Sequence, residues 1–188
     1  MDAKEILIAE HKPILLVLKA IRQLCSQIVE GAEVDTALFR QIIEFVRNYA
    51  DKYHHMKEED QLFNRMEGEM DQRLKDGPVL GMLVEHDLGR RFISKLAEAL
   101  NRWDQGDKSA KLDVIANAIG YEQLLQEHIH KEDNVIYPLA WRQLAPETKE
   151  SLNRLFAEIE ADPENAAIRD KYVNFARELA DRLGIATI

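Results

Sequence analysis

The stretch "HHMKEEDQLF" at residues 54–63 has a second copy in the chain, "HIHKEDNVIY" at residues 128–137. In the best register the first histidine and the glutamate four residues later coincide, so that His54 and Glu58 match His128 and Glu132. A register that matches His55 with His128 instead loses most of the similarity. The repeated unit is therefore a histidine followed by a glutamate at the fourth position.

A second repeat accompanies the first one. The dipeptide "EH" occurs at residues 10–11 and again at residues 85–86, 43 and 42 residues before the histidines of the two copies. Each half of the chain thus reads as a helix with one histidine, a turn, and a returning helix with the His-x-x-x-Glu pair. A duplicated helical hairpin folded face to face would bring six side chains together near the axis. These are His11, His54, Glu58, His86, His128 and Glu132.

The spacing of the repeated pair has a chemical reason. Residues four apart lie on one face of a helix, about 6 Å apart along its axis, so a histidine and a glutamate can reach one metal ion. Free imidazoles and carboxylates are costly inside an apolar bundle, and metal coordination removes that cost. A single His-x-x-x-Glu pair is common by chance, whereas two copies that each follow "EH" favour a metal site over ordinary polar residues.

Residues beside the six expected ligands need a separate interpretation. His55 and His130 fall off the ligand face, and we expect them to be surface residues or residues that support the ligands. Glu59 and Asp133 lie one position further round the helix, where solvated acids are expected. A supporting hydrogen bond to a ligand is the alternative for these two acids.

The periodicity predicts an all-α protein, because eight glycines and five prolines interrupt otherwise helical patterns and strand-like alternation is not apparent. The expected helices are a short one before Pro13, then Pro13–Glu30, Asp35–Met66, Pro78–Trp103 and Lys108–Tyr137, where Pro138 bends or ends the helix. Two more helices begin at "APE" (145–147) and "DPE" (162–164), and the last one ends at Gly184. We predict an up-down-up-down four-helix bundle over residues 1–145 and an appended helical hairpin over 146–188, which packs on the bundle or contacts a partner.

Composition and charge exclude several other classes of protein. The 188 residues suffice for one domain, or for one domain with an appended helical piece. A net charge of −9 repels phosphates and anionic lipids, so we expect no nucleic-acid partner. Cys25 is the only cysteine and can form neither an internal disulfide nor a cysteine cluster. We expect a cytoplasmic protein without a membrane segment, because no apolar stretch approaches the length of about 18 residues that spans a bilayer.

The pattern EH…HHxxEE…EH…HxxxE resembles the hemerythrin-like (HHE) cation-binding domain, a four-helix bundle around a non-haem di-iron centre. The resemblance covers about residues 1–145. It implies two iron ions with an oxo or hydroxo bridge, with manganese as the alternative in one or both positions. Carried over by position, it implies six metal ligands: His11, His54, Glu58, His86, His128 and Glu132.

The resemblance also bears on function. Oxygen-carrying hemerythrins have a His-x-x-x-His pair on the third helix, whereas Met82 and Arg90 lie four residues from His86 here. The ligand set is more similar to di-iron proteins linked to nitric oxide and oxidative stress. It implies a protein that binds, senses or reduces O₂, NO or peroxide in stress response or iron homeostasis, with oxidoreductase activity left open. The alternative is a metal-holding or protein-interaction module without turnover, with a homodimer or a protein partner formed through the C-terminal helices.

The wall of a small-ligand pocket is expected near the ligand faces. The candidates, for each of which core packing is the alternative, are Leu15, Leu62, Gly89, Ile93, Tyr121 and Leu125. Gly89, one turn after His86, could permit a close helix contact or leave space for a small ligand. Tyr121 lies on roughly the same face as His128 and could donate a hydrogen bond into the centre.

Overall fold

The first helical hairpin joins an α-helix to a returning helix that is partly π-helical. The computed structural model describes residues 2–71 and 75–186. The hairpin consists of α1 (Ala3–Val29), α2 (Thr36–Phe45), the π-helical segments η1 (Val46–His55) and η2 (Glu58–Phe63), and α3 (Asn64–Glu69). Asp2 caps α1 in a capping box with Glu5, and Asp35 caps α2 as expected. The returning helix therefore starts where the sequence predicts, although its turns widen toward the middle of the bundle.

The second helical hairpin repeats this arrangement. It consists of η3 (Lys75–Val79), α5 (Leu80–Asp104), α6 (Ala110–Lys131), the π-helical η4 (Glu132–Ile136) and α7 (Tyr137–Gln143). The helix does not end at Tyr137, because α7 continues beyond Pro138. Proline clashes with the carbonyl four residues before it in an α-helix, and the π-helical turn that precedes Pro138 changes this spacing.

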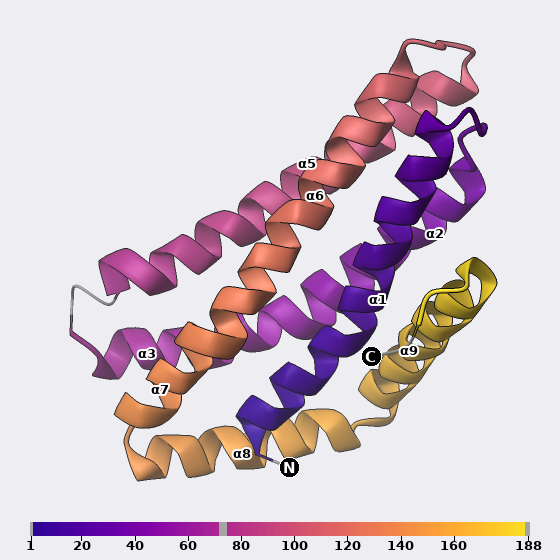
Figure 1. Cartoon of the computed structure of the whole chain (residues 1–188). Coiled ribbons are helices and arrows are strands. Elements are labelled where there is room, and N and C mark those ends of the chain that lie inside the picture. Colours follow the sequence, from indigo (N-terminus) through magenta and orange to yellow (C-terminus); the bar gives the residue numbers. More distant parts are fainter. Residues whose placement is uncertain (1, 72–74, 187–188) are drawn as a thin grey trace.

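The two hairpins form the predicted bundle, which is all-α: the described residues contain no β-strand (Figure 1). The helix α6 packs against both α1 and α5, and α2 packs against α5. The expected boundary at Pro13 is wrong, because α1 runs through it without a break. Pro13 removes one backbone donor, but it is buried like Leu7 and Ile14 on either side of it, and this packing outweighs the local loss.

Two apolar clusters fill the bundle and leave a polar layer between them. One cluster contains Leu7, Phe63 and Met82, and the other contains Ile14, Tyr53 and Ile93. The expected ligands fall between these clusters along each of the long helices. The list of buried polar residues is Glu10, His11, His54, His55, Lys57, Glu58, His86, Glu122, His128 and Glu132.

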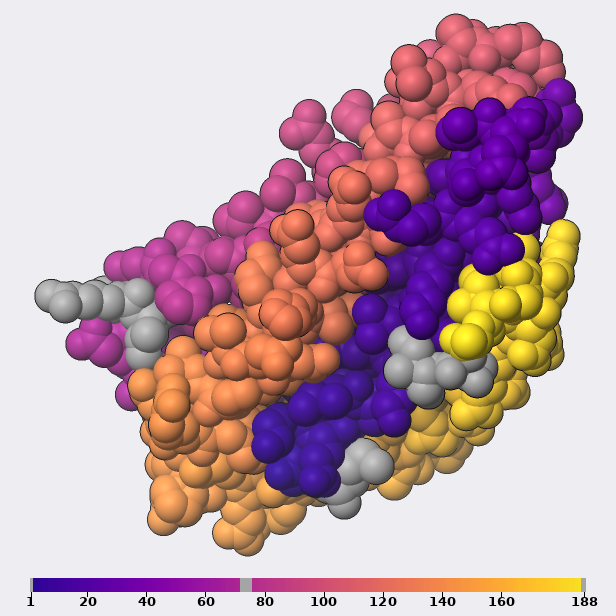
Figure 2. Space-filling view, viewed as in Figure 1, coloured from indigo at the N-terminus to yellow at the C-terminus, as the bar shows by residue number. Residues whose placement is uncertain are grey.

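The C-terminal helices α8 (Pro146–Ala161) and α9 (Pro163–Leu183) pack on the outside of the bundle. The helix α8 crosses beneath the beginning of α1, and α9 runs along α1 and η1 (Figure 1). On the face seen in Figure 2, α1 lies between α6 and α9. Leu152 and Phe156 of α8 and Leu179 of α9 are buried in the clusters described above. Gly184 ends α9 in the left-handed conformation, as the sequence predicts.

Candidate metal centre

The six residues expected to bind metal lie together in the polar layer, and each is at most 1% exposed. The histidines form two pairs. The Nε2 atoms of His11 and His54 are 3.0 Å apart, and those of His86 and His128 are also 3.0 Å apart. Four helical segments supply one histidine each, namely α1, η1, α5 and α6. The fold therefore brings all six residues together, three from each hairpin: one histidine from its first helix and the His-x-x-x-Glu pair from its returning helix.

Both glutamates span the two histidine pairs. Glu132 places Oε2 3.3 Å from Nε2 of His11 and Oε1 3.0 Å from Nε2 of His128. Glu58 places Oε2 3.6 Å from Nε2 of both His54 and His86. Each carboxylate thus contacts one imidazole of each pair, which is the arrangement that two adjacent metal ions with shared carboxylates require.

The far side of every imidazole ring is held by another carboxylate. The Nδ1 contacts are His11 with Asp133 at 2.9 Å, His54 with Glu10 at 2.9 Å, His86 with Glu59 at 2.6 Å, and His128 with Glu85 at 2.9 Å. An ionised carboxylate only accepts hydrogen bonds, so when these acids are ionised each Nδ1 carries the proton and each Nε2 faces inward. Glu59 and Asp133 are therefore not merely solvated, because each contacts Nδ1 of a candidate ligand, which is the supporting role expected as the alternative. The roles of Glu10 and Glu85 went unassigned, although the repeated "EH" contains their signal.

The inward-facing atoms show whether a metal ion fits. With protons on Nδ1, the Nε2 lone pairs of each histidine pair face one another, and only a proton or a metal ion between them relieves the repulsion. Two nitrogens bound at about 2.1 Å to one ion at a right angle lie about 3.0 Å apart, which is the spacing in both pairs. Oε2 of Glu58 and both carboxylate oxygens of Glu132 find no hydrogen-bond donor among the described residues. The donor set therefore fits two cations.

The pKa values of the histidines show which rings hold a proton when no metal is bound. Burial lowers the pKa of His11, but the neighbouring carboxylates of Asp133 and Glu132 outweigh burial and raise the pKa to about 9. Burial also opposes protonation of His128, yet the charge of Glu132 raises its pKa to about 10. Burial holds the pKa of His54 well below its usual range. One histidine of each pair thus favours a proton, which a metal ion must displace.

The two halves of the centre differ in one aromatic residue. The hydroxyl of Tyr137 donates a hydrogen bond to Oε1 of Glu58 at 2.5 Å and lies 3.4 Å from Nε2 of His11. Its counterpart in the repeat is Phe63, whose ring centroid lies 6.1 Å from that of His86. Only the His11 side therefore has a phenol at the ligands, and the sequence alignment of the two copies already contains this difference.

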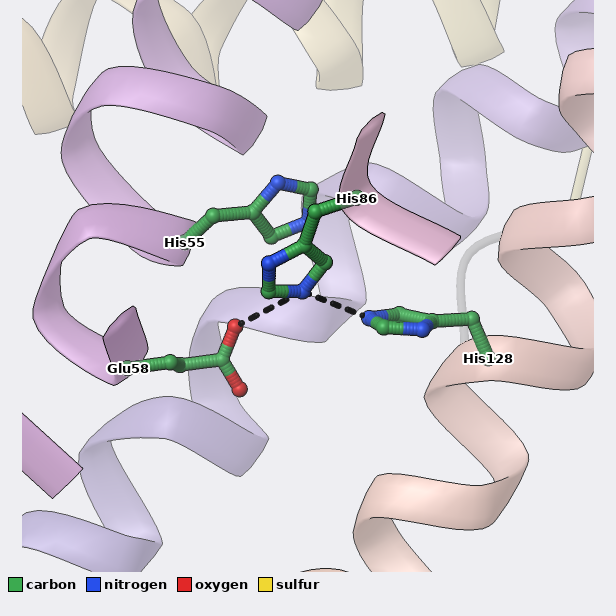
Figure 3. A group of neighbouring side chains, drawn as sticks. All are labelled: His55, Glu58, His86 and His128. Atoms are coloured by element: carbon green, nitrogen blue, oxygen red, sulfur yellow. Dashed lines mark hydrogen bonds and ion pairs between the residues drawn. The ribbon is translucent and has the colours of Figure 1, made fainter. Parts of the chain in front are cut away.

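His55 is buried, so of its two expected roles it is not a surface residue but a residue beside the candidate ligands, whereas His130 is exposed. The ring of His55 stacks on that of His86 with centroids 3.9 Å apart, while His86 points to Glu58 and His128 (Figure 3). The expectation assumed α-helical turns, and the wider π-helical turns of η1 carry His55 inward. Its potential ligand atoms lie within 4.8 Å of those of Glu58, His86 and His128, so His55 borders the centre directly.

A cavity of about 200 Å³ adjoins the His86 side of the centre. Its lining includes His55, His86, Gly89, Ile93 and Tyr121. A methyl group added at Gly89 would lie 3.3 Å from the Leu125 side chain, so Gly89 permits the close approach of α5 and α6. The Tyr121 hydroxyl is buried and has no hydrogen-bond partner within the described ranges. Three of the six residues proposed for a pocket wall thus line this cavity: Gly89, Ile93 and Tyr121.

Residues 2–140 match a family model described as the hemerythrin HHE cation-binding domain. No curated protein and no solved structure matched the chain. Among the residues that the structure describes, no helix is long and apolar enough to cross a membrane. The family match, together with the two groups of histidine and glutamate side chains able to hold a metal, assigns cation binding to the polar layer.

Proposed function

Because the chain belongs to the family of hemerythrin HHE cation-binding domains, we propose that it holds two iron ions and binds, senses or reduces small oxidants. O₂, NO and peroxide are the ligands that fit, in a role in stress response or iron homeostasis. The observation that carries this proposal is the pair of facing imidazole pairs, each with Nε2 atoms 3.0 Å apart. Each pair accommodates one ion, and the two glutamates reach both.

The donor set supports iron and leaves manganese as the alternative. Four imidazole nitrogens and two carboxylates suit iron, manganese or zinc, and the centre lacks the thiolate that would favour a softer ion. The protonated Nδ1 atoms on their carboxylates raise the basicity of the ligands and fix their orientation. The ligand assignment of His11, His54, Glu58, His86, His128 and Glu132 is part of this proposal.

The centre leaves room for a small ligand. Two imidazoles and two shared carboxylates supply about four ligands per ion, fewer than the six of octahedral coordination. Bound iron would supply redox-active coordination positions at which a small oxidant is taken up or reduced. The cavity of about 200 Å³ beside His86 is smaller than the usual range for drug-sized ligands, about 300–1,000 Å³, and so favours a diatomic molecule or a peroxide.

The surrounding residues exclude water and hold the ligands in place. Tyr137 fixes the carboxylate of Glu58 by donating its hydroxyl hydrogen. Arg90 binds Glu59, the acid that accepts from Nδ1 of His86. The unpartnered hydroxyl of Tyr121 offers a hydrogen-bond donor to a molecule that enters the cavity.

The second candidate is a metal-holding or protein-interaction module without turnover. The near-complete burial of all six ligands favours it, because buried ligands with oriented rings retain an ion well whether or not it reacts. The two candidates share the metal centre and differ in reactivity. They therefore call for separate measurements of metal content and of the response to oxidants.

The test combines metal analysis with optical spectroscopy of the reduced protein under argon. We expect about two iron or manganese atoms per chain, and a change of the iron absorption bands when O₂, peroxide or NO is added. The zinc-loaded protein is the control, since zinc has no redox chemistry. One ion per chain, or zinc alone from iron-replete cells, would contradict the di-iron proposal. If the protein held two iron ions but its absorption spectrum did not change with any of the three reagents, the metal-holding module would be favoured.

A further inference from the structure

A lysine and a carboxylate support one histidine in each half of the bundle. In the first half Lys57 contacts Glu10, which accepts the hydrogen of Nδ1 from His54. In the second half Lys131 contacts Glu85, which accepts the hydrogen of Nδ1 from His128. The duplication therefore reaches beyond the ligands, to the acid that orients each of these two rings and to the cation that holds that acid.

The two supports differ in their surroundings. The side chains of Lys57 and Glu10 are each 5% exposed, whereas those of Lys131 and Glu85 are 38% and 20% exposed. Water screens the second ion pair much more than the first. A buried ammonium needs good partners, because leaving its charge unpaired is strongly destabilising.

The additional partner of Lys57 comes from the C-terminal hairpin. Oε1 of Glu160, near the end of α8, lies 3.0 Å from Nζ of Lys57. Glu160 is itself held by the Tyr53 hydroxyl at 2.6 Å and by Nη1 of Arg169, from α9, at 3.0 Å. Both C-terminal helices thus contribute to a continuous series of charged groups that ends on the Nδ1 side of His54.

We propose that Glu160 is a positioning residue for the metal bound by His11 and His54. By keeping Lys57 against Glu10, it fixes the carboxylate that orients His54, and it has no such effect on the ring of His128. This inference rests on the two-metal centre of the proposed function, and it gives the C-terminal hairpin a role in the centre besides packing.

The surroundings of Lys57 indicate how the loss of Glu160 would act. A surface cavity of about 360 Å³ borders Lys57, Tyr53 and Ile159. An ammonium that has lost one of its two carboxylates can turn into this cavity and regain water. Glu10 would then be free to leave Nδ1 of His54, and loss of such an outer support lowers metal affinity by about 10–100-fold. Because Glu160 acts through two intervening residues, we expect the low end, on the order of tenfold.

The experiment uses the full chain loaded with zinc, which gives sharp nuclear magnetic resonance signals. Two quantities are measured in wild type and in Glu160→Ala: the affinity for each of the two zinc ions, and the exchange of each Nδ1 hydrogen with water. We expect the variant to weaken one ion on the order of tenfold and to accelerate exchange at His54 while His128 stays unchanged. Glu160→Gln, which keeps an acceptor for Lys57, should lie close to wild type.

Glu150→Ala is the matched control, because Glu150 lies on the same helix and pairs with Arg154 at the surface, away from the polar layer. It should change neither zinc affinity nor exchange. If Glu160→Ala changed neither the zinc affinities nor the exchange at His54, this inference would be overturned while the two-metal centre would stand. That conclusion would hold even if the metal-free variant were less stable. Equal effects on His54 and His128 would also overturn it. A wild type that binds fewer than two zinc ions would overturn both the inference and the two-metal centre.

Discussion

Replacement of Glu132 by glutamine removes the charge that both histidine pairs share. Both carboxylate oxygens of Glu132 are buried without a donor in the part of the chain that the structure describes, and they lie 3.3 Å from His11 and 3.0 Å from His128. An amide would keep the volume, but it would turn two N–H groups toward an imidazole nitrogen in place of one carboxylate oxygen. We therefore expect Glu132→Gln to fold and to lose most of its metal affinity.

The size of the effect follows from linkage between binding and folding. A metal at about 1,000 times its dissociation constant stabilises the native state by about 4.1 kcal/mol. For a chain of 188 residues, each kcal/mol shifts Tm by about 2–4 °C, so metal should raise the Tm of wild type by about 8–16 °C. A loss of about 100-fold in affinity would leave about 1.4 kcal/mol, or about 3–6 °C, in the variant.

The assay is differential scanning calorimetry of metal-free and metal-loaded protein at a fixed concentration of free metal. Glu122→Gln is the matched control, since Glu122 is also buried but binds Arg22 outside the metal centre. That substitution should lower both Tm values together and leave their difference as in wild type. If metal raised the Tm of Glu132→Gln as much as that of wild type, Glu132 would not be a ligand, and the shared-carboxylate centre would be refuted.

Three further outcomes are expected. His54→Ala should lower metal content and metal-induced stability together, whereas His55→Ala should leave metal content near wild type; equal losses by elemental analysis would show that the register of the repeat is wrong. The metal-free protein should lose stability as pH rises from about 6.5 to 10, because folding raises the pKa of His11 to about 9 and that of His128 to about 10. The protonated rings stabilise the native state fully only below the unfolded pKa of 6.5, and this stability is lost as the pH passes the folded pKa values. Calorimetry at pH 6, 8 and 9.5 tests this, and a constant or rising Tm would contradict it. Gly120→Ala should cost about 1–3 kcal/mol in chemical denaturation with the metal stoichiometry intact, because its methyl group would lie 2.5 Å from the ring of Phe92; an unchanged midpoint would show that the helices yield.

The sequence sufficed for the bundle and for the clustering of the six ligand candidates because both depend on local spacing. A histidine and a glutamate four residues apart share a helix face, and the repeat relates one pair to the other. The caps at Asp35 and Gly184 were predictable for the same reason, since each depends on its own residue type and immediate neighbours.

The expectations for residues beside the ligands failed where π-helical turns altered the helical period and where contacts join distant parts of the chain. An α-helical period puts His55 outside, and the π-helical turns of η1 place it against His86. The acids next to the ligands were assigned to solvent because the partners of Glu59 and Asp133 lie on other helices, 27 and 122 residues away. A local sequence pattern does not identify partners so far apart in the chain, so only the folded structure reveals these contacts.

The duplication accounts for the clustering of the six candidate ligands, and its departures from symmetry distinguish the two histidine pairs. Each half repeats two histidines, a glutamate, two acids that contact imidazole Nδ1 atoms, and a lysine. The His11 side has the hydroxyl of Tyr137, and the His86 side has the stacked ring of His55 and the adjoining cavity. Under the proposed function, a small oxidant that entered by this cavity would meet the His86 pair first, while the hairpin contact through Glu160 would act on the other pair. Reactivity and structural control would then lie on different ions of one centre, which a perfectly repeated hairpin could not provide.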